Sequence, residues 1–349
     1  MSGSTVKSPI GDETGVARST NRLDFLDGIR GVGAALVVIQ HLFETWFPSF
    51  ATWSQAWIHP GRVGVVAFFV VSGYVVALTL SKQTVATFAT RRFWRLYPVY
   101  WVATVIWVLV DVSTGDAWSG YGIFVIAANA LMIQGALGMT SILGTGWTLG
   151  MEVFFYAQAA VSKKLGRLAG SAYLGLAWLA AFAALALVNK LLGAHYGYLM
   201  PVMLIYAALG FSLYFKDVGR GGPWMVLLLA STVGVGALSF PFLWAYDERN
   251  PFSVFSFNAS HLAGLAIFFV FRAVKHRSVS KALLWLGGLS YALYLIHVPV
   301  MMLFYRGGVP AWLGIPSATA ASLVAAMLLR HYVERPSIWW GRKLSDRRP

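Results

Sequence analysis

The sequence of 349 residues contains no cysteine, and only 11% of its residues are charged. Without cysteine, disulfides, thiolate metal ligands and cysteine nucleophiles are excluded. A soluble domain of this size carries about a quarter charged residues. Because 58% of the residues are hydrophobic, the composition indicates an integral membrane protein that crosses the bilayer several times.

Several common catalytic motifs are also missing. The sequence has no P-loop, no GxSxG nucleophile elbow and no HExxH motif. We therefore predict no metal site. Acidic residues are too scarce in the apolar stretches to form an obvious chain of proton carriers.

The net charge is +14, and the basic residues gather at the ends of the apolar stretches. This pattern is typical of the cytoplasmic loops of membrane proteins, so we expect contact with membrane lipid and no binding of nucleic acid. Both termini are predicted to be cytoplasmic, in a multi-pass protein of the plasma or inner membrane. Residues 1–22 are expected to form a polar tail, residues 23–338 the transmembrane domain, and residues 339–349 a basic tail.

Eleven apolar stretches approach the length of about 20 residues that a membrane-spanning helix needs. The loop at 111–120 is poor in basic residues and the loop at 163–167 is rich in them, so an odd number of crossings must separate these loops. Two stretches, 121–138 and 147–162, lie between them. The sequence therefore predicts an all-α integral membrane protein with about ten transmembrane helices and a re-entrant or interfacial segment near 121–146. Irregular backbone at membrane depth must be buried or line a cavity, so the bend before residue 147 is expected to line one.

Two ionisable residues share the first apolar helix. Arg30 and His41 are about three helical turns apart, which places them on one face, roughly 16 Å from each other along the axis. Ionisable residues inside a membrane are functional candidates by default. The alternative is that Arg30 reaches the lipid headgroups and His41 hydrogen-bonds to a neighbouring helix.

A second basic group precedes the third apolar helix. Arg92 and Arg95 are three residues apart and would share one face of a helix. Two guanidinium groups so placed fit phosphate groups, which they bind through paired hydrogen bonds. The alternative is a simple anchor that touches lipid phosphates.

Two further segments carry polar residues within apolar runs. Trp147 opens the segment that contains Glu152, a carboxylate that could orient an imidazole or pair with Arg95. Tyr294 and His297 belong, with Ser290, to one polar stripe of a later helix. This stripe either lines a site or packs between helices.

Together these segments resemble the membrane-bound acyltransferase family 3. The resemblance runs in order through nearly the whole chain, about residues 23–338. It rests on the following segments: Leu26 to Arg30 with His41, Gly64 to Gly73 including Ser72, Arg92 and Arg95 before Tyr97-Pro98, Asn129 to Gln134, Trp147 to Glu152, Gly287 to Pro299, and Glu334 to Pro336.

The resemblance implies ten transmembrane helices and an enzyme that transfers an acyl group, usually acetyl, from cytoplasmic acyl-CoA to a hydroxyl group. The acceptor would be a carbohydrate, such as a polysaccharide or glycolipid, or a small molecule such as a macrolide. By resemblance His41 is the catalytic histidine, Arg30 is essential, and Arg92 and Arg95 face the CoA phosphates. Acyl-CoA would be a substrate, with no permanently bound cofactor.

The residues themselves are consistent with this reading, because a neutral imidazole is a suitable general base for a hydroxyl near pH 7. They leave open whether His41 acts as the base or is itself acylated, and whether the protein forms a homo-oligomer. A carrier or exporter of a glycolipid or polysaccharide is the main alternative function, and a structural partner in an envelope complex is a third. A carrier predicts internal inverted repeats, and the sequence shows none.

Overall fold

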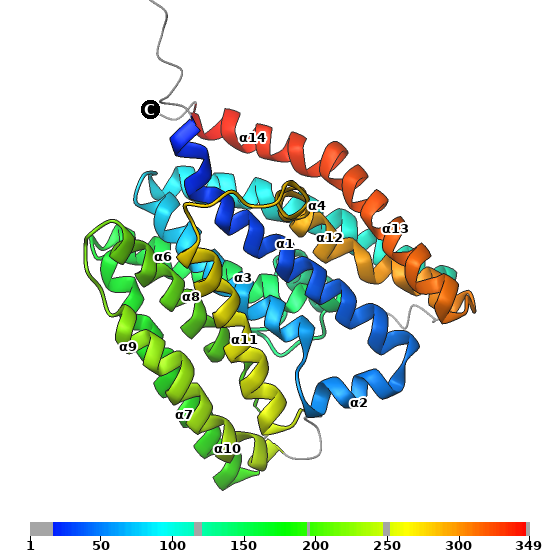
Figure 1. Cartoon of the computed structure of the whole chain (residues 1–349), viewed down its shortest axis with the longest axis horizontal. Helices are drawn as coiled ribbons and strands as arrows, with labels where there is room; N and C mark the ends of the chain where they lie inside the picture. Colours follow the sequence, from blue (N-terminus) through cyan, green and yellow to red (C-terminus); the bar gives the residue numbers. More distant parts are fainter. Residues whose placement is uncertain (1–16, 115–120, 194–195, 247–251, 347–349) are drawn as a thin grey trace, which may run out of the picture.

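The structure is a computed structural model that describes residues 17–114, 121–193, 196–246 and 252–346. Within these ranges the chain is a bundle of helices without β-strands (Figure 1). The long helices are α1 (Ala17–Trp46), α3 (Pro60–Leu80), α4 (Val85–Ser113), α6 (Trp147–Lys164), α7 (Leu174–Leu192), α8 (Leu199–Asp217), α11 (Val254–Ala273), α12 (Lys281–Arg306) and α13 (Ala311–Leu329). The shorter ones are α2 (Pro48–Ala56), α5 (Ile123–Ala130), η1 (Gly144–Gly146), η2 (Ala169–Tyr173), α9 (Trp224–Leu229), η3 (Ala230–Gly234), α10 (Val235–Tyr246), η5 (Arg330–Glu334) and α14 (Arg335–Asp346).

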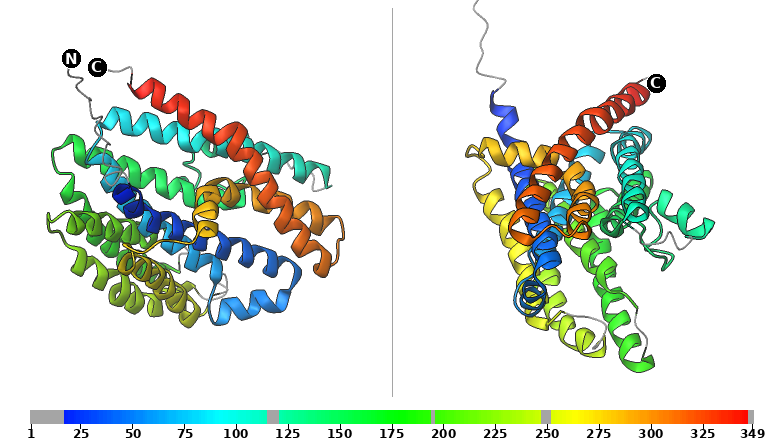
Figure 2. Two further views of the ribbon diagram at one scale, coloured as in Figure 1. Left: turned by 45° about the horizontal axis from the view of Figure 1, so that its top comes forward. Right: turned by 90° about the vertical axis from the view of Figure 1, so that its right-hand side faces the viewer.

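Eight helical segments of the described chain are long and apolar enough to cross a membrane. This confirms a multi-pass, all-helical membrane protein. Two more helices run beside these segments (Figure 2). One is the 18-residue α6, and the other is the continuous helix formed by α9, the π-helical η3 and α10. The expected number of ten crossings, and the side of the membrane on which each terminus lies, stay predictions.

The interior of the bundle is formed by α1, α3, α8 and α12. Helix α8 is the most enclosed of the eight segments, and α1 lies between α3 and α12. The helices approach closely where glycine occupies the contact. A Cβ atom at Gly287 of α12 would lie only 2.0 Å from the Asp27 carbonyl oxygen of α1. This close packing fixes the register between α1 and α12, which both contribute to the site described below.

Local sequence signals define the starts of several helices. Helix α3 begins with Pro60, whose missing N–H group costs nothing at this position. The Nδ1 atom of His59 accepts a hydrogen bond from the Arg62 backbone N–H at 3.1 Å. Thr84 caps α4 in the same way, because its hydroxyl oxygen accepts from the Thr87 N–H.

The segment between residues 121 and 146 contains only α5, η1 and irregular backbone. Helix α5 has eight residues and is about 12 Å long, well short of the roughly 30 Å core of a bilayer. Asn129 ties the returning chain to α5, since its side chain donates to the Thr140 carbonyl and accepts from the Ile142 N–H, both at 2.9 Å. The 121–138 stretch therefore does not form a spanning helix of its own.

The C-terminal segment lies against α4. Helix α14 continues to Asp346, and Arg91 of α4 forms an ion pair with Asp346 at 2.7 Å. Residues 339–346, expected from the sequence to belong to a tail, are thus helical and in contact with the bundle. The start of α1 and the end of α14 lie at the same end of the molecule (Figure 1).

Candidate active site

Two cavities enter the bundle and share Val65 and Tyr294 in their walls. We name them by their contents. The basic cavity has a volume of about 100 Å³, and its polar lining includes Arg30, Ser72, Arg92, Arg95, Glu152 and Tyr156. The histidine cavity has a volume of about 420 Å³, and its lining includes His41, Glu44, His59, Arg62, Thr145 and Trp147.

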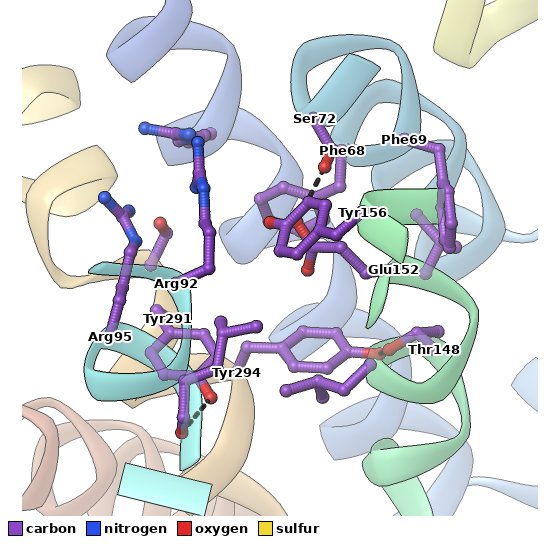
Figure 3. Close-up of a pocket in the computed structure, with 15 residues that line it drawn as sticks. Phe68, Phe69, Ser72, Arg92, Arg95, Thr148, Glu152, Tyr156, Tyr291 and Tyr294 are labelled. Carbon is purple, nitrogen blue, oxygen red and sulfur yellow. Dashed lines mark hydrogen bonds between the residues drawn. The ribbon is translucent and has the colours of Figure 1, made fainter. Parts of the chain in front are cut away.

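Three arginines meet in the basic cavity although they come from different parts of the chain. Arg30 belongs to α1, whereas Arg92 and Arg95 belong to α4. Figure 3 shows Arg92 and Arg95 extending side by side along one wall. Their spacing of three residues places both on the same face of α4. The cavity thus presents three guanidinium groups to whatever it binds.

The arginines have few charged partners. Arg30 forms an ion pair with Asp27, its neighbour one turn earlier, at 3.2 Å. Arg92 donates to the Thr79 hydroxyl at 3.3 Å, and its guanidinium carbon lies 5.0 Å from the centre of the Tyr156 ring. The cavity therefore keeps a positive excess that suits an anionic ligand.

Glu152 lies on the opposite wall of the basic cavity (Figure 3). The Ser72 hydroxyl donates to its Oε1 atom at 2.7 Å, and the Tyr156 hydroxyl donates to the same oxygen. Neither His41 nor Arg95 is among its hydrogen-bond partners. The structure therefore does not place Glu152 against an imidazole, one of the two roles that the sequence suggested for it.

The carboxylate that contacts His41 is Glu44. Its Oε1 atom lies 2.6 Å from His41 Nδ1, and its Oε2 atom accepts from the Gln40 amide at 2.7 Å. An ionised carboxylate only accepts hydrogen bonds, so Nδ1 carries the proton and Nε2 is left as the basic nitrogen. Sequence reasoning missed Glu44. The available signal was its position three residues after His41, which puts both side chains on one face of α1.

His297 of α12 lies beside this pair. The centres of the His41 and His297 rings are 5.3 Å apart. His297 is buried, and its Nδ1 atom donates to the Leu293 carbonyl at 2.9 Å. Its other ring nitrogen has no hydrogen-bond partner within the described part of the chain. The polar stripe on α12 therefore passes from Ser290 in the basic cavity to His297 against His41.

Tyr294 occupies the wall common to both cavities. Its hydroxyl lies 2.8 Å from the Thr148 hydroxyl of α6, and Thr148 donates to the Thr145 carbonyl. Because the Thr148 proton is already engaged, Tyr294 is the donor in this pair. The bend before α6 thus lines the histidine cavity through Gly144 and Thr145, and Thr148 in the first turn of α6 binds the phenol that lines both cavities.

The family profile for an acyltransferase domain, Acyl_transf_3, matches residues 23–331. The chain belongs to acyltransferase family 3. This membership covers almost all of the described helices, so the two cavities lie within the family's domain. It favours an enzyme over the carrier and the structural partner considered from the sequence.

Curated proteins similar to this family member include two that align over most of their length. Exopolysaccharide production protein ExoZ of Rhizobium meliloti (strain 1021) is 26% identical over 81% of this chain and 91% of its own. Acyltransferase MdmB of Streptomyces mycarofaciens is 26% identical over 94% of both chains. The putative membrane-bound transacylase BcsY of Komagataeibacter xylinus is 29% identical over 39% of this chain and 36% of its own. No solved structure matches the chain.

Proposed function

We propose that this acyltransferase moves an acyl group, most simply acetyl, from acyl-CoA to a hydroxyl group of its acceptor. The observation that carries this proposal is the junction of the two cavities at Val65 and Tyr294. Three arginines lie on one side of the junction and the His41–Glu44 pair lies on the other. The basic cavity would bind the donor, and the histidine cavity would bind the acceptor.

The donor is assigned by charge. CoA carries several phosphate groups, and guanidinium groups bind phosphate through paired, charge-assisted hydrogen bonds. Arg30, Arg92 and Arg95 provide three such groups in one cavity. The basic loops favour a cytoplasmic position for this end of the bundle, in a plasma or inner membrane. Cytoplasmic acyl-CoA would then enter where the arginines are, with its thioester directed toward Tyr294.

The reaction follows from the tautomer of His41. Glu44 holds the Nδ1 proton, so Nε2 removes the proton from the acceptor hydroxyl as its oxygen attacks the thioester carbonyl. The tetrahedral intermediate then breaks its C–S bond, and the imidazolium returns the proton to the CoA thiolate. The products are the ester and CoA thiol. Glu44 stabilises the imidazolium between these two steps.

The acceptor class comes from the relatives. One is named for exopolysaccharide production, which supports a carbohydrate hydroxyl as the acceptor here. A small molecule with a hydroxyl group is the other acceptor that the sequence resemblance implies. The histidine cavity, at about 420 Å³, has the size of a site for a sugar or a drug-sized molecule.

The donor assignment is tested by comparing acetyl-CoA with S-acetylpantetheine, which has the same thioester and no nucleotide phosphates. Binding is measured by calorimetry on protein in lipid nanodiscs. We expect the native protein to prefer acetyl-CoA, and the Arg92→Ala/Arg95→Ala variant to lose at least about tenfold of that preference, since a charge-assisted hydrogen bond contributes about 1.5–3 kcal/mol. Arg91→Ala is the matched control, because Arg91 pairs with Asp346 and does not line the cavity.

Equal losses in the Arg91 variant and in the double variant would assign these arginines to general attraction at the membrane surface. An unchanged preference in the double variant would refute the donor site. Lysine at positions 92 and 95 should restore only part of the affinity, because a point charge replaces a planar fork.

A further inference from the structure

The acceptor side of the molecule contains a buried arginine that the proposed reaction does not use. Arg62 lines the histidine cavity and is only 8% exposed. Its Nη1 atom has no hydrogen-bond partner among the residues that the structure describes. A guanidinium group buried without a counter-charge is costly, so such a group usually meets a ligand or a carboxylate.

The side chains that the structure places against the Arg62 guanidinium are aromatic. Its guanidinium carbon lies 3.9 Å from the centre of the Phe252 ring and 5.3 Å from that of Phe257, and the Tyr198 hydroxyl interacts with it. Aromatic faces stabilise a cation only in part. Among the ion pairs of the described residues, none involves Arg62.

The backbone adds positive potential at the same place. Arg62 lies in the first turn of α3, and Gly61 of that turn also lines the cavity. A helix of 21 residues carries a partial positive charge at its N-terminus. Two independent features therefore favour an anion at one point of the histidine cavity. One is a buried guanidinium group with no ion-pair partner among the described residues, and the other is this helix terminus.

This point is separate from the reacting pair. Glu44 binds His41 directly and lies 4.0 Å from His59 Nε2, whereas the other ring nitrogen of His59 accepts from the Arg62 backbone. His59 therefore stands between the His41–Glu44 pair and the first turn of α3. Arg62 is therefore not in contact with the atoms of the proposed proton transfer.

We propose that the acceptor is anionic, and that Arg62 binds its carboxylate or phosphate while one of its hydroxyl groups lies at His41. A uronic acid residue of a polysaccharide and a sugar phosphate both have this chemistry. The inference rests on the proposed function only in giving the histidine cavity to the acceptor. It adds that charge, and not only the presence of a hydroxyl, selects the acceptor.

The test uses methyl β-D-glucuronide, with methyl β-D-glucoside as a neutral analogue of the same ring and glucose 1-phosphate as the phosphate arm. Full-length protein is placed in phosphatidylcholine nanodiscs with saturating CoA, which occupies the other anion site. Binding is measured by saturation-transfer difference NMR. We expect native protein to bind the glucuronide or the sugar phosphate at least about tenfold more tightly than the glucoside. The preferred anion identifies the acceptor class.

Arg62→Gln should lose that preference and leave binding of the glucoside unchanged. Arg306→Gln is the matched control, because Arg306 pairs with Asp111 and does not line the histidine cavity. An equal loss in both variants, or the same preference in Arg62→Gln as in native protein, would overturn the proposal. So would equal binding of anionic and neutral sugars by native protein, a result that requires no variant to fold.

The two proposals fail separately. His41→Ala should still bind the anionic sugar although it transfers no acyl group. Binding of the sugar without any acetyl transfer by native protein would contradict the proposed function and leave the anion site standing. Equal acetyl transfer to neutral and anionic sugars would contradict the anion site and support the proposed function.

Discussion

The two cavities of this acyltransferase differ in how their charges are arranged. The described lining of the basic cavity contains Arg30, Arg92 and Arg95 from two helices and one carboxylate, Glu152, which is already bound by two hydroxyl groups. The histidine cavity instead contains a matched pair, His41 and Glu44, in direct contact. An excess of one charge suits recognition of a polyanion, whereas a paired acid and base suits proton transfer.

The largest loss of turnover is expected when the His41–Glu44 pair is changed. His41→Ala should lower the rate of acetyl transfer by about 10²–10⁴-fold, the usual contribution of a general base. Affinity for acetyl-CoA should stay within about twofold of the native value, because His41 does not line the basic cavity. Turnover and calorimetric titration of the same nanodisc sample measure both quantities.

His276→Ala is the control for that experiment, since His276 is an exposed residue between α11 and α12. If the His41 variant keeps full turnover, the proposed base is wrong. If it loses both turnover and donor affinity, the two cavities are not separate in function.

The next effect distinguishes the two carboxylates. Glu44→Gln should lower turnover by about tenfold to a hundredfold, because a charged hydrogen bond contributes about 1.5–3 kcal/mol. Glu152→Gln should change turnover at saturating donor by less than that, because Glu152 contacts Ser72 and Tyr156 and not the imidazole. If Glu152→Gln lowers turnover at saturating donor more than Glu44→Gln does, Glu152 is the catalytic carboxylate.

A smaller effect is expected at the shared wall. Tyr294→Phe removes the hydrogen bond to Thr148 and keeps the ring. We expect turnover to fall by roughly twofold to tenfold, since a neutral hydrogen bond contributes about 0.5–1.5 kcal/mol. Tyr291→Phe is the control, because Tyr291 lines only the basic cavity and bonds to the Leu96 carbonyl at 2.8 Å. Equal effects on turnover in both variants would show that the wall shared by the two cavities has no particular role in the reaction.

The last effect concerns stability rather than turnover, and it involves the histidine cavity alone. Burial, with the nearby charge of Arg62, lowers the pKa of His59 to about 4. The unfolded chain takes up a proton at this histidine near pH 6.5 and the folded protein does not, so stability is complete above about pH 6.5 and falls as the pH decreases toward 4. The His59→Asn variant can still cap α3. Over this pH range we expect its free energy of unfolding to fall by roughly 1–3 kcal/mol less than that of the native protein.

Melting temperatures measured between pH 7 and pH 4 give the comparison. The curves of native protein and His59→Asn should diverge below about pH 6.5, whereas His276→Ala should follow the native curve. Parallel curves for all three proteins would show that His59 does not titrate differently in the folded state.

The sequence was informative wherever a signal depends on neighbouring residues. The spacing of Arg92 and Arg95 predicted one shared face, and both side chains line one cavity. The loop charges indicated that the 121–138 stretch fails to cross, and the structure has only the short α5 there. The carboxylate beside His41 was not found from the sequence. Glu152 was favoured because it is an acid in an apolar run, whereas the structure places Glu44, one turn after the histidine, against His41.

The sequence by itself determined the class of the protein: an all-helical membrane acyltransferase whose Arg30 and His41 share one helix. Hydropathy, loop charge and short motifs suffice for this because they act over a few residues at a time. Only the tertiary structure decided that Arg30 and His41 line different cavities, that Tyr294 lines both, and that Arg62 is buried with no ion-pair partner among the described residues. These facts depend on how α1, α3, α4 and α12 pack, and contacts between residues that are distant in the chain leave no local pattern to read.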